Sequence, residues 1–297
     1  LAIDQANNLF GAELSYDSQK WISSVWKITS DGRFTYLIEP TSRPPRGMSM
    51  WADASGNTFV VEQDNHLKRA TLLVRRSPNG QVTTFAGSGY GRRDGKGGSA
   101  SFGSIGGMHI GVDATIYLTD GTSVRRVTSD GVVSTVASDL TKRTPDDAPL
   151  LFGKNEGILA GLTIDKDKNV YLADAGNQRL LKIAADGSVK VVYRGESSYY
   201  PNGVTVDGSG NLYALEVGFT PPATWLPARV RKITSSGSSS IIAVSGQGTA
   251  EQPPSAQPYS RNDPHSPYRY RYLVPWLSIG ILAFSVGAWI ITRRARS

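Results

Sequence analysis

Five segments of the chain repeat one pattern of apolar and polar positions. Each contains a short apolar run, a polar turn that usually holds Asn or Gly, and a second apolar and aromatic run that ends on an acidic residue. This pattern predicts two antiparallel strands joined by a hairpin turn. The five copies cover residues 1–13, 49–62, 107–120, 161–174 and 203–216.

A second pair of apolar runs follows each segment and completes the repeat. Four of the five copies turn on Asp-Gly or Asn-Gly, and glycine tolerates the positive φ that such turns require. Each repeat is therefore four antiparallel strands in about 42–58 residues, the size of a β-propeller blade. Because an isolated blade leaves apolar faces exposed, we expect the blades to pack face to face around an axis. The fold class is all-β, with five blades visible.

The repeats resemble those of the NHL-repeat propellers, which belong to the six-bladed, TolB-like propeller superfamily. The stretch LTIDKDKNVYLADAGNQRLLKIAADG (162–187) carries the resemblance, together with a glycine-rich connector at 85–110 in which we expect Phe102 to be buried. The resemblance covers residues 1–246 and implies the fold, but this family includes enzymes, RNA binders, sensors and scaffolds. Since Leu1 falls inside a first strand, we expect either a sixth blade upstream or a five-bladed ring.

The C-terminal part of the chain changes character. Residues 247–271 are rich in Pro, Gln and Ser and predict a disordered stalk. Residues 272–292 carry no charge, and as a helix they would span roughly 30 Å, the thickness of a bilayer core. The short tail 293–297 is basic and closes the segment. We therefore expect a single-pass transmembrane helix.

Charge is uneven along the chain. The formal net charge is +7, yet residues 1–250 hold a net of about +3, because Arg residues flank the apolar tail. A propeller this close to neutrality does not favour nucleic-acid binding, which we keep as a second alternative. The chain has no cysteine, which excludes disulfides, thiolate metal sites and a cysteine nucleophile.

One face of the propeller is expected to carry the long connections. Strands alternate in direction, so the loops between second and third strands share a face with the connectors between blades. We predict loops of this kind at 14–24, 63–72 and 217–229. Aromatic rings beside arginines suit a protein, peptide or glycan ligand, although the rings can instead fill their own loops beside a solvated basic rim. The ligand-binding candidates are Trp21, Arg46, Arg69, Arg92, Tyr200 and Trp225.

The acids that end the second strands form another candidate group. In a propeller they would ring the axis and offer a site for a cation or for sugar hydroxyls. The alternative is structural: the sequence around Asp174 predicts a turn in which this carboxylate accepts backbone hydrogen bonds and pairs with Arg179. The members of this axial polar ring are Glu13, Glu62, Asp120, Asp174 and Glu216.

Asn202 is the residue that bears most directly on whether the chain is a metal-dependent enzyme. It resembles the metal-binding Asn of gluconolactonase and regucalcin-like propellers, which implies a Ca²⁺ or Zn²⁺ cofactor. The matching positions in other blades hold Arg46, Gly106 and Ala160, so a second carboxylate ligand is not apparent. Three histidines are too few for the zinc site of amidating-lyase propellers, and neither a nucleophile elbow nor a phosphate loop is present.

These observations favour a membrane-anchored binding module that uses no cofactor and performs no catalysis. A Pro-rich stalk lifts a domain off a membrane surface, so we expect an extracytoplasmic propeller, with a tail-anchored cytoplasmic protein as the alternative topology. The functional alternative is a metal-dependent, lactonase-like hydrolase.

Overall fold

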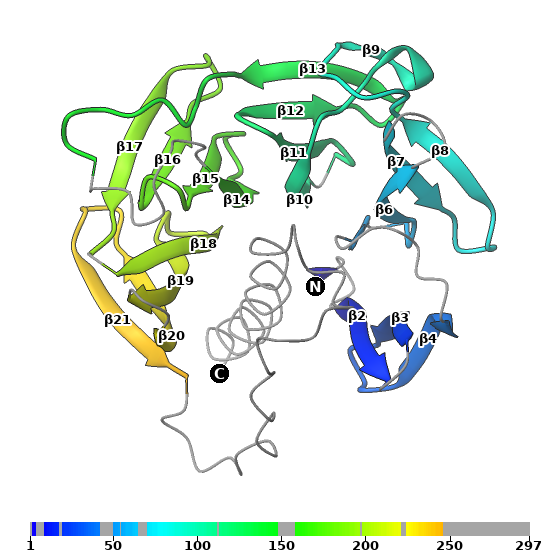
Figure 1. The fold of residues 1–297 in the computed structure, drawn as a ribbon, viewed down its shortest axis with the longest axis horizontal. Coiled ribbons are helices and arrows are strands. Elements are labelled where there is room, and N and C mark those ends of the chain that lie inside the picture. Colours follow the sequence, from blue (N-terminus) through cyan, green and yellow to red (C-terminus); the bar gives the residue numbers. More distant parts are fainter. Residues whose placement is uncertain are drawn as a thin grey trace, which may run out of the picture.

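The computed structural model describes the backbone of residues 2–3, 9–17, 20–41, 50–53, 55–64, 70–111, 113–147, 158–196, 198–220 and 224–245. These residues form antiparallel sheets, with a single short 3₁₀ turn at Gly97–Ser99 between them. Figure 1 shows five sheets arranged in chain order along an arc, with the first strand of each toward the middle and the last at the outside. The propeller architecture predicted from the repeats is confirmed for this part of the chain.

Each of the five blades contains four consecutive strands. Blade 1 consists of β1 (Ala2–Ile3), β2 (Leu9–Asp17), β3 (Lys20–Ile28) and β4 (Phe34–Thr41), and blade 2 of β5 (Met50–Ala52), β6 (Thr58–Asp64), β7 (Ala70–Arg76) and β8 (Val82–Ala86). Blade 3 consists of β10 (Ile105–Ile110), β11 (Ile116–Asp120), β12 (Ser123–Val127) and β13 (Val132–Ala137), with β9 (Gly95–Lys96) added at its outer edge. Blade 4 consists of β14 (Leu159–Ile164), β15 (Val170–Asp174), β16 (Arg179–Ile183) and β17 (Val189–Arg194), and blade 5 of β18 (Tyr199–Val206), β19 (Leu212–Thr220), β20 (Thr224–Ile233) and β21 (Ser239–Val244).

The first hairpin turn of blades 4 and 5 is fixed by an aspartate. In blade 4 the Asp165 carboxylate accepts the backbone N–H groups of Asp167 and Asn169, and also the side-chain amide of Asn169. Asp207 and Asn211 repeat these contacts in blade 5. Such side-chain bonds stabilise a turn because they satisfy backbone donors that the strand ladder leaves free.

The second hairpin turn depends on glycine. Gly32, Gly80, Gly131, Gly187 and Gly237 each have φ between +83° and +92°, where glycine has no steric penalty. The prediction of glycine-dependent second turns is therefore confirmed in all five blades.

The hydrophobic core lies between the blades. Phe59 and Leu73 of blade 2 pack in one cluster with Met108 and Leu118 of blade 3, and the connector residue Phe102 is fully buried among them, as expected. Equivalent clusters join blade 3 to blade 4 and blade 4 to blade 5. Burial of these faces stabilises the array because no single sheet can bury both of its sides.

The inner strands approach each other closely at glycines. β10, β14 and β18 each contain a register irregularity near their starts. There a Cβ on Gly107 would lie 2.4 Å from the carbonyl oxygen of Ala160, and a Cβ on Gly161 would lie 2.9 Å from Cα of Gly203. Glycine is required because the backbones of neighbouring blades pack directly against one another.

Two predicted loops are instead continuations of hairpins. Residues 14–17 and 20–24 belong to β2 and β3, with Tyr16 opposite Trp21, and residues 217–220 and 224–229 belong to β19 and β20, with Phe219 opposite Trp225. The loop predictions were wrong there because polar residues interrupt the apolar pattern, although these residues lie within the strands. Aromatic residues at opposite ladder positions are a typical source of hairpin stability.

The C-terminal predictions concern a different part of the chain. The stalk at 247–271, the helix at 272–292 and the tail at 293–297 lie outside the described residues. No helix among the described residues has the length and apolarity needed to cross a membrane. The anchor and the sixth blade stay predictions.

Candidate functional site

Blades 3, 4 and 5 share one polar arrangement on the face of the connectors. In each, an acid of the second strand, Asp120, Asp174 or Glu216, is paired with an arginine of the third strand, and this arginine also binds an acid from the connector that enters the blade. We call each set an acid–arginine–acid bridge. The three bridges are Asp120–Arg125–Asp94, Asp174–Arg179–Asp147 and Glu216–Arg229–Glu196.

The bridge of blade 3 joins the glycine-rich connector to the sheet. Nη1 of the fully buried Arg125 donates to Asp120 at 2.8 Å, and its Nη2 donates to Asp94 at 2.7 Å. The other oxygen of Asp120 accepts the backbone N–H groups of Gly103 and Ser104. This carboxylate is therefore satisfied by hydrogen bonds and neutralised by Arg125, which suits a structural role.

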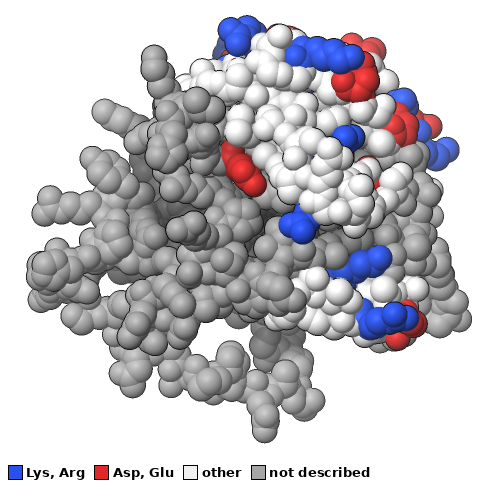
Figure 2. All heavy atoms as spheres, turned by 90° about the vertical axis from the view of Figure 1, so that its right-hand side faces the viewer, with Lys and Arg blue, Asp and Glu red and all other residues white. Residues whose placement is uncertain are grey.

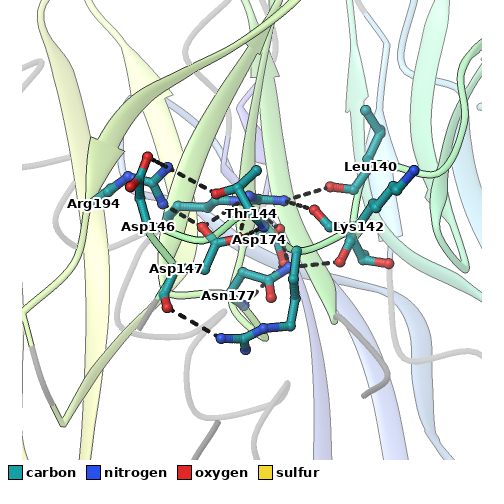
Figure 3. Close-up of polar contacts among 11 residues, drawn as sticks. Leu140, Lys142, Thr144, Asp146, Asp147, Asp174, Asn177 and Arg194 are labelled. Carbon is teal, nitrogen blue, oxygen red and sulfur yellow. Dashed lines mark hydrogen bonds and ion pairs between the residues drawn. The ribbon is translucent and has the colours of Figure 1, made fainter. Parts of the chain in front are cut away.

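The bridge of blade 4 is the most extensive. Arg179 donates from Nε to Asp174 at 2.9 Å and from Nη1 to Asp147 at 2.8 Å, and its Nη2 binds the carbonyl oxygens of Leu140 and Lys142 (Figure 3). Burial raises the pKa of Asp174, while the bonds from Asn177 and Arg179 oppose that shift. The Asp174–Arg179 pair predicted from the sequence is present.

The bridge of blade 5 contains two arginines. Glu216 is fully buried and accepts from Arg229 Nε at 2.6 Å, from Arg231 Nε at 3.2 Å and from the hydroxyl of Tyr193 at 2.8 Å. Both arginines also bind Glu196 of the connector, at 3.0 Å from Arg229 and 2.5 Å from Arg231. The hydrogen bond from Arg229 lowers the pKa of Glu196, so this carboxylate is ionised at neutral pH.

These bridges decide whether the acids fit a divalent cation. Ca²⁺ and Zn²⁺ require carboxylate oxygens or other lone pairs that are free to coordinate. Asn202 lies in β18 next to Pro201, the register partner of Glu216, but the Glu216 oxygens are directed to Arg229, Arg231 and Tyr193. Two guanidinium charges at this carboxylate oppose a cation, so Glu216 does not fit as a metal ligand beside Asn202.

Other acids and histidines are further candidates for metal ligands. Among the residues that the structure describes, no group of three or more His, Cys, Asp or Glu side chains is placed to hold a metal ion. His109 lies in β10, and burial lowers its pKa to about 4. His66 and His265 lie outside the described residues.

The predicted ligand-binding residues fall into two groups. Arg92 is exposed and donates to the hydroxyl of Thr122 at 3.0 Å, which places it beside the loop between the second and third strands of blade 3, and Tyr200 is half-buried in β18. The backbones of Trp21 and Trp225 lie in β3 and β20, but their side chains are outside the described part, as are Arg46, Arg69 and the side chain of Glu13. Glu62 lies in β6 and is half-buried.

The connector acids were missed in the sequence reasoning. Asp94, Asp147 and Glu196 lie in stretches of irregular spacing, and each binds an arginine that is distant in sequence. The available signal was the acid in each of these connectors, followed by an arginine in the third strand of the blade that the connector enters. Exposed neighbours of these acids, including Tyr90, Arg92, Arg93 and Lys142, form what we call the connector surface.

No protein-family model and no curated protein matches the sequence. Similar solved structures include virginiamycin B lyase from Staphylococcus aureus, at 14% identity and TM-score 0.43, covering 80% of this chain and 89% of that one. The calcium-binding protein regucalcin from Agrobacterium tumefaciens has 14% identity and TM-score 0.46 over 82% and 78% of the two chains. A gluconolactonase from Xanthomonas campestris has 13% identity and TM-score 0.42 over 70% and 69%.

These similarities concern the all-β, propeller-like architecture, which the five blades of this chain show by themselves. At such identities and TM-scores no activity is carried over to this chain. The assignment to the NHL-repeat type stays a prediction.

Proposed function

We propose that the chain is a membrane-anchored binding module whose connector surface takes a protein, peptide or glycan ligand. The observation that carries the proposal is the pairing of acids in the three bridges. Arginines neutralise the buried carboxylates and attach each connector to its sheet, while aromatic and basic side chains on two of these connectors stay exposed. A rigid scaffold with exposed connector residues suits binding better than catalysis.

The connector surface has the composition of a recognition site. Tyr90 is 69% exposed although its backbone is bridged to Phe102, and Arg92 and Arg93 follow it in an ordered stretch. An exposed ring beside guanidinium groups on a fixed backbone loses little conformational entropy on binding, because the backbone is ordered beforehand.

The distribution of basic side chains favours a specific ligand over nucleic acid or another polyanion. Among the described residues on the side of the molecule in view in Figure 2, Lys and Arg side chains lie in separate patches, several of them next to Asp or Glu. Nucleic acids require a continuous basic surface for their phosphate backbone. The nucleic-acid alternative therefore has little support from this side of the propeller.

The lactonase-like alternative needs a direct test. Some similar structures are described as gluconolactonase or as the calcium-binding protein regucalcin, so this fold is compatible with such chemistry. In this chain, however, the carboxylate nearest to Asn202 in the ladder is held by two arginines and a tyrosine. Detection of lactone hydrolysis that depends on added Ca²⁺ or Zn²⁺, and is lost in Asn202→Ala, would establish the alternative.

Ligand capture tests the binding function. The full chain in detergent micelles is screened against peptide and glycan arrays, and the hits are measured again with a Tyr90→Ala/Arg92→Ala variant. We expect at least about a tenfold loss of affinity, because buried aromatic and arginine contacts dominate most interfaces. Arg126→Ala is the matched control, since Arg126 is also exposed but lies within β12. Equal capture by all three proteins would contradict the proposal.

The anchor is tested separately. We propose that residues 272–292 hold the propeller at the membrane and that the propeller faces away from the cytoplasm. The full chain should stay with membranes after washing at high pH, and a chain that ends at residue 271 should not. Protease added to intact cells or spheroplasts should cleave the propeller; protection of the propeller would favour the cytoplasmic topology.

A further inference from the structure

Glu196 is held differently from the other two connector acids. The Asp94 carboxylate accepts hydrogen bonds from Arg125 and from both the backbone N–H and the hydroxyl of Thr135. The buried Asp147 carboxylate accepts from Arg179, from Arg194 and from the backbone N–H of Thr144. The Glu196 carboxylate accepts from Arg229 and Arg231 and from no other described residue. Its side chain is 58% exposed, whereas both arginines are more than nine-tenths buried.

The charge balance beneath Glu196 also differs from that in blade 3. Arg229 and Arg231 together face one buried carboxylate, Glu216, so one positive charge remains for Glu196 to neutralise. In blade 3 the single Arg125 is already neutralised by the buried Asp120. Removal of the connector acid would therefore leave one guanidinium charge without a neutralising carboxylate in blade 5 but not in blade 3.

The two guanidinium groups are fixed in place without help from Glu196. Arg229 lies over the ring of Tyr199 at 3.5 Å, and Arg231 lies 5.6 Å from the ring centre of Tyr193. Their Nε atoms are both bound to Glu216, which leaves the Nη2 groups directed at the exposed carboxylate. Preorganised guanidinium groups of this kind bind a carboxylate with each oxygen on its own donor.

We propose that Arg229 and Arg231 form a carboxylate-binding site for an acidic peptide, and that Glu196 is its built-in occupant. The resident ligand is itself a glutamate on a surface turn, so a Glu or Asp side chain of a partner protein matches the site in chemistry and in approach. A partner carboxylate takes over both Nη2 donors as Glu196 rotates into solvent. The inference rests on the proposed binding function and names the chemical class of its ligand.

The backbone next to Glu196 is compatible with this exchange. Ser198 has φ of +70°, a left-handed conformation that a residue with a Cβ rarely adopts. The strand residue Tyr199 donates its N–H to the Glu196 carbonyl oxygen at 3.1 Å, so this connector is a tight turn held in a strained conformation. Release of the Glu196 side chain removes one of the contacts that maintain the turn.

The test uses the full chain in detergent and removes the built-in occupant. Glu196→Ala and the more conservative Glu196→Gln are titrated with sodium acetate and with two capped tripeptides, Gly-Glu-Gly and Gly-Gln-Gly, at constant ionic strength set with chloride. Binding is followed by calorimetry and by the shift in thermal unfolding midpoint. Asp94→Ala is the matched control, because it removes the equivalent acid without creating a surplus cation.

We expect Glu196→Ala to bind acetate and the Glu peptide at least about tenfold more tightly than the unchanged chain, because the internal competitor is gone. Glu196→Gln should lie between them, and Asp94→Ala should match the unchanged chain. Equal carboxylate binding by Glu196→Ala and Asp94→Ala would overturn the inference. Binding of acetate by Glu196→Ala without tighter binding of Gly-Glu-Gly than of Gly-Gln-Gly would overturn the peptide assignment.

This outcome is independent of the capture assay for the connector surface. Loss of ligand capture in Tyr90→Ala/Arg92→Ala tests the proposed function, and acetate binding by Glu196→Ala tests the arginine pair. Failure of one experiment leaves the other result intact.

Discussion

Substitution of Arg179 by methionine tests the structural role of the bridges most severely. Arg179 is buried and binds two buried carboxylates and two backbone carbonyl groups. Methionine keeps much of the side-chain volume and removes the charge. Asp174 would retain its bonds from Asn177, and Asp147 would retain Arg194 and the N–H of Thr144.

The expected cost follows from these remaining contacts. Loss of one partner of a buried ion pair typically destabilises a protein by about 3–5 kcal/mol, because the other charge is left without compensation. We expect the lower part of that range for Arg179→Met, since both carboxylates keep hydrogen bonds. Arg194→Met should cost less, about 1 kcal/mol, because the Arg194 side chain is 36% exposed and Asp147 keeps its bond from Arg179.

Hydrogen exchange detected by mass spectrometry is the appropriate assay, because repeat proteins open locally and a single unfolding midpoint averages over their blades. Peptides from 138–147 and β16 of Arg179→Met should exchange faster by a factor on the order of 100 or more. Lower pH should reduce the difference, because the uncompensated Asp174 becomes protonated in the folded variant. Equal exchange in Arg179→Met and Arg194→Met would refute the assignment of Arg179 as the centre of the bridge.

Two further predictions concern packing and pH. A Cβ at Gly107 would clash with the Ala160 carbonyl oxygen, so Gly107→Ala should lower the free energy of unfolding in urea by roughly 1–3 kcal/mol. Gly208 has open space around it, so Gly208→Ala should not lower this free energy. Equal effects of the two substitutions would contradict the packing account. The folded-state pKa of His109, about 4, lies below its unfolded value of about 6.5, so its protonation costs stability progressively as pH falls from about 6.5 to 4. His109→Gln should remove about 1–3 kcal/mol of that pH dependence, and an unchanged pH profile would contradict it.

The blades could be predicted from the sequence because their signals are local. Alternating apolar residues and an Asp-Gly or Asn-Gly turn act within one hairpin, so the strands around 162–187 appear where the pattern indicates. The Asp174–Arg179 pair was also predictable, since both residues lie in adjoining strands of one blade.

The rest depends on contacts between distant segments. Asp147 and Arg179 are brought together only when the connector folds over blade 4, and no local pattern reports that approach. Glu196 likewise meets Arg229 and Arg231 across a whole hairpin. The strands at 14–17, 20–24, 217–220 and 224–229 were missed because their polar residues are typical of loops, although these residues lie within the strands.

Metal content is the most direct test of the central claim that arginines occupy the buried acids of blades 3, 4 and 5 and that the chain is a binding module. The full chain, purified in detergent and equilibrated with Ca²⁺ and Zn²⁺, is examined by elemental analysis alongside Asn202→Ala and Glu216→Gln. The account predicts no stoichiometric metal in any of the three proteins, and lower stability for Glu216→Gln because Arg229 and Arg231 lose their buried partner. One bound metal ion per chain that disappears in both variants would contradict the account.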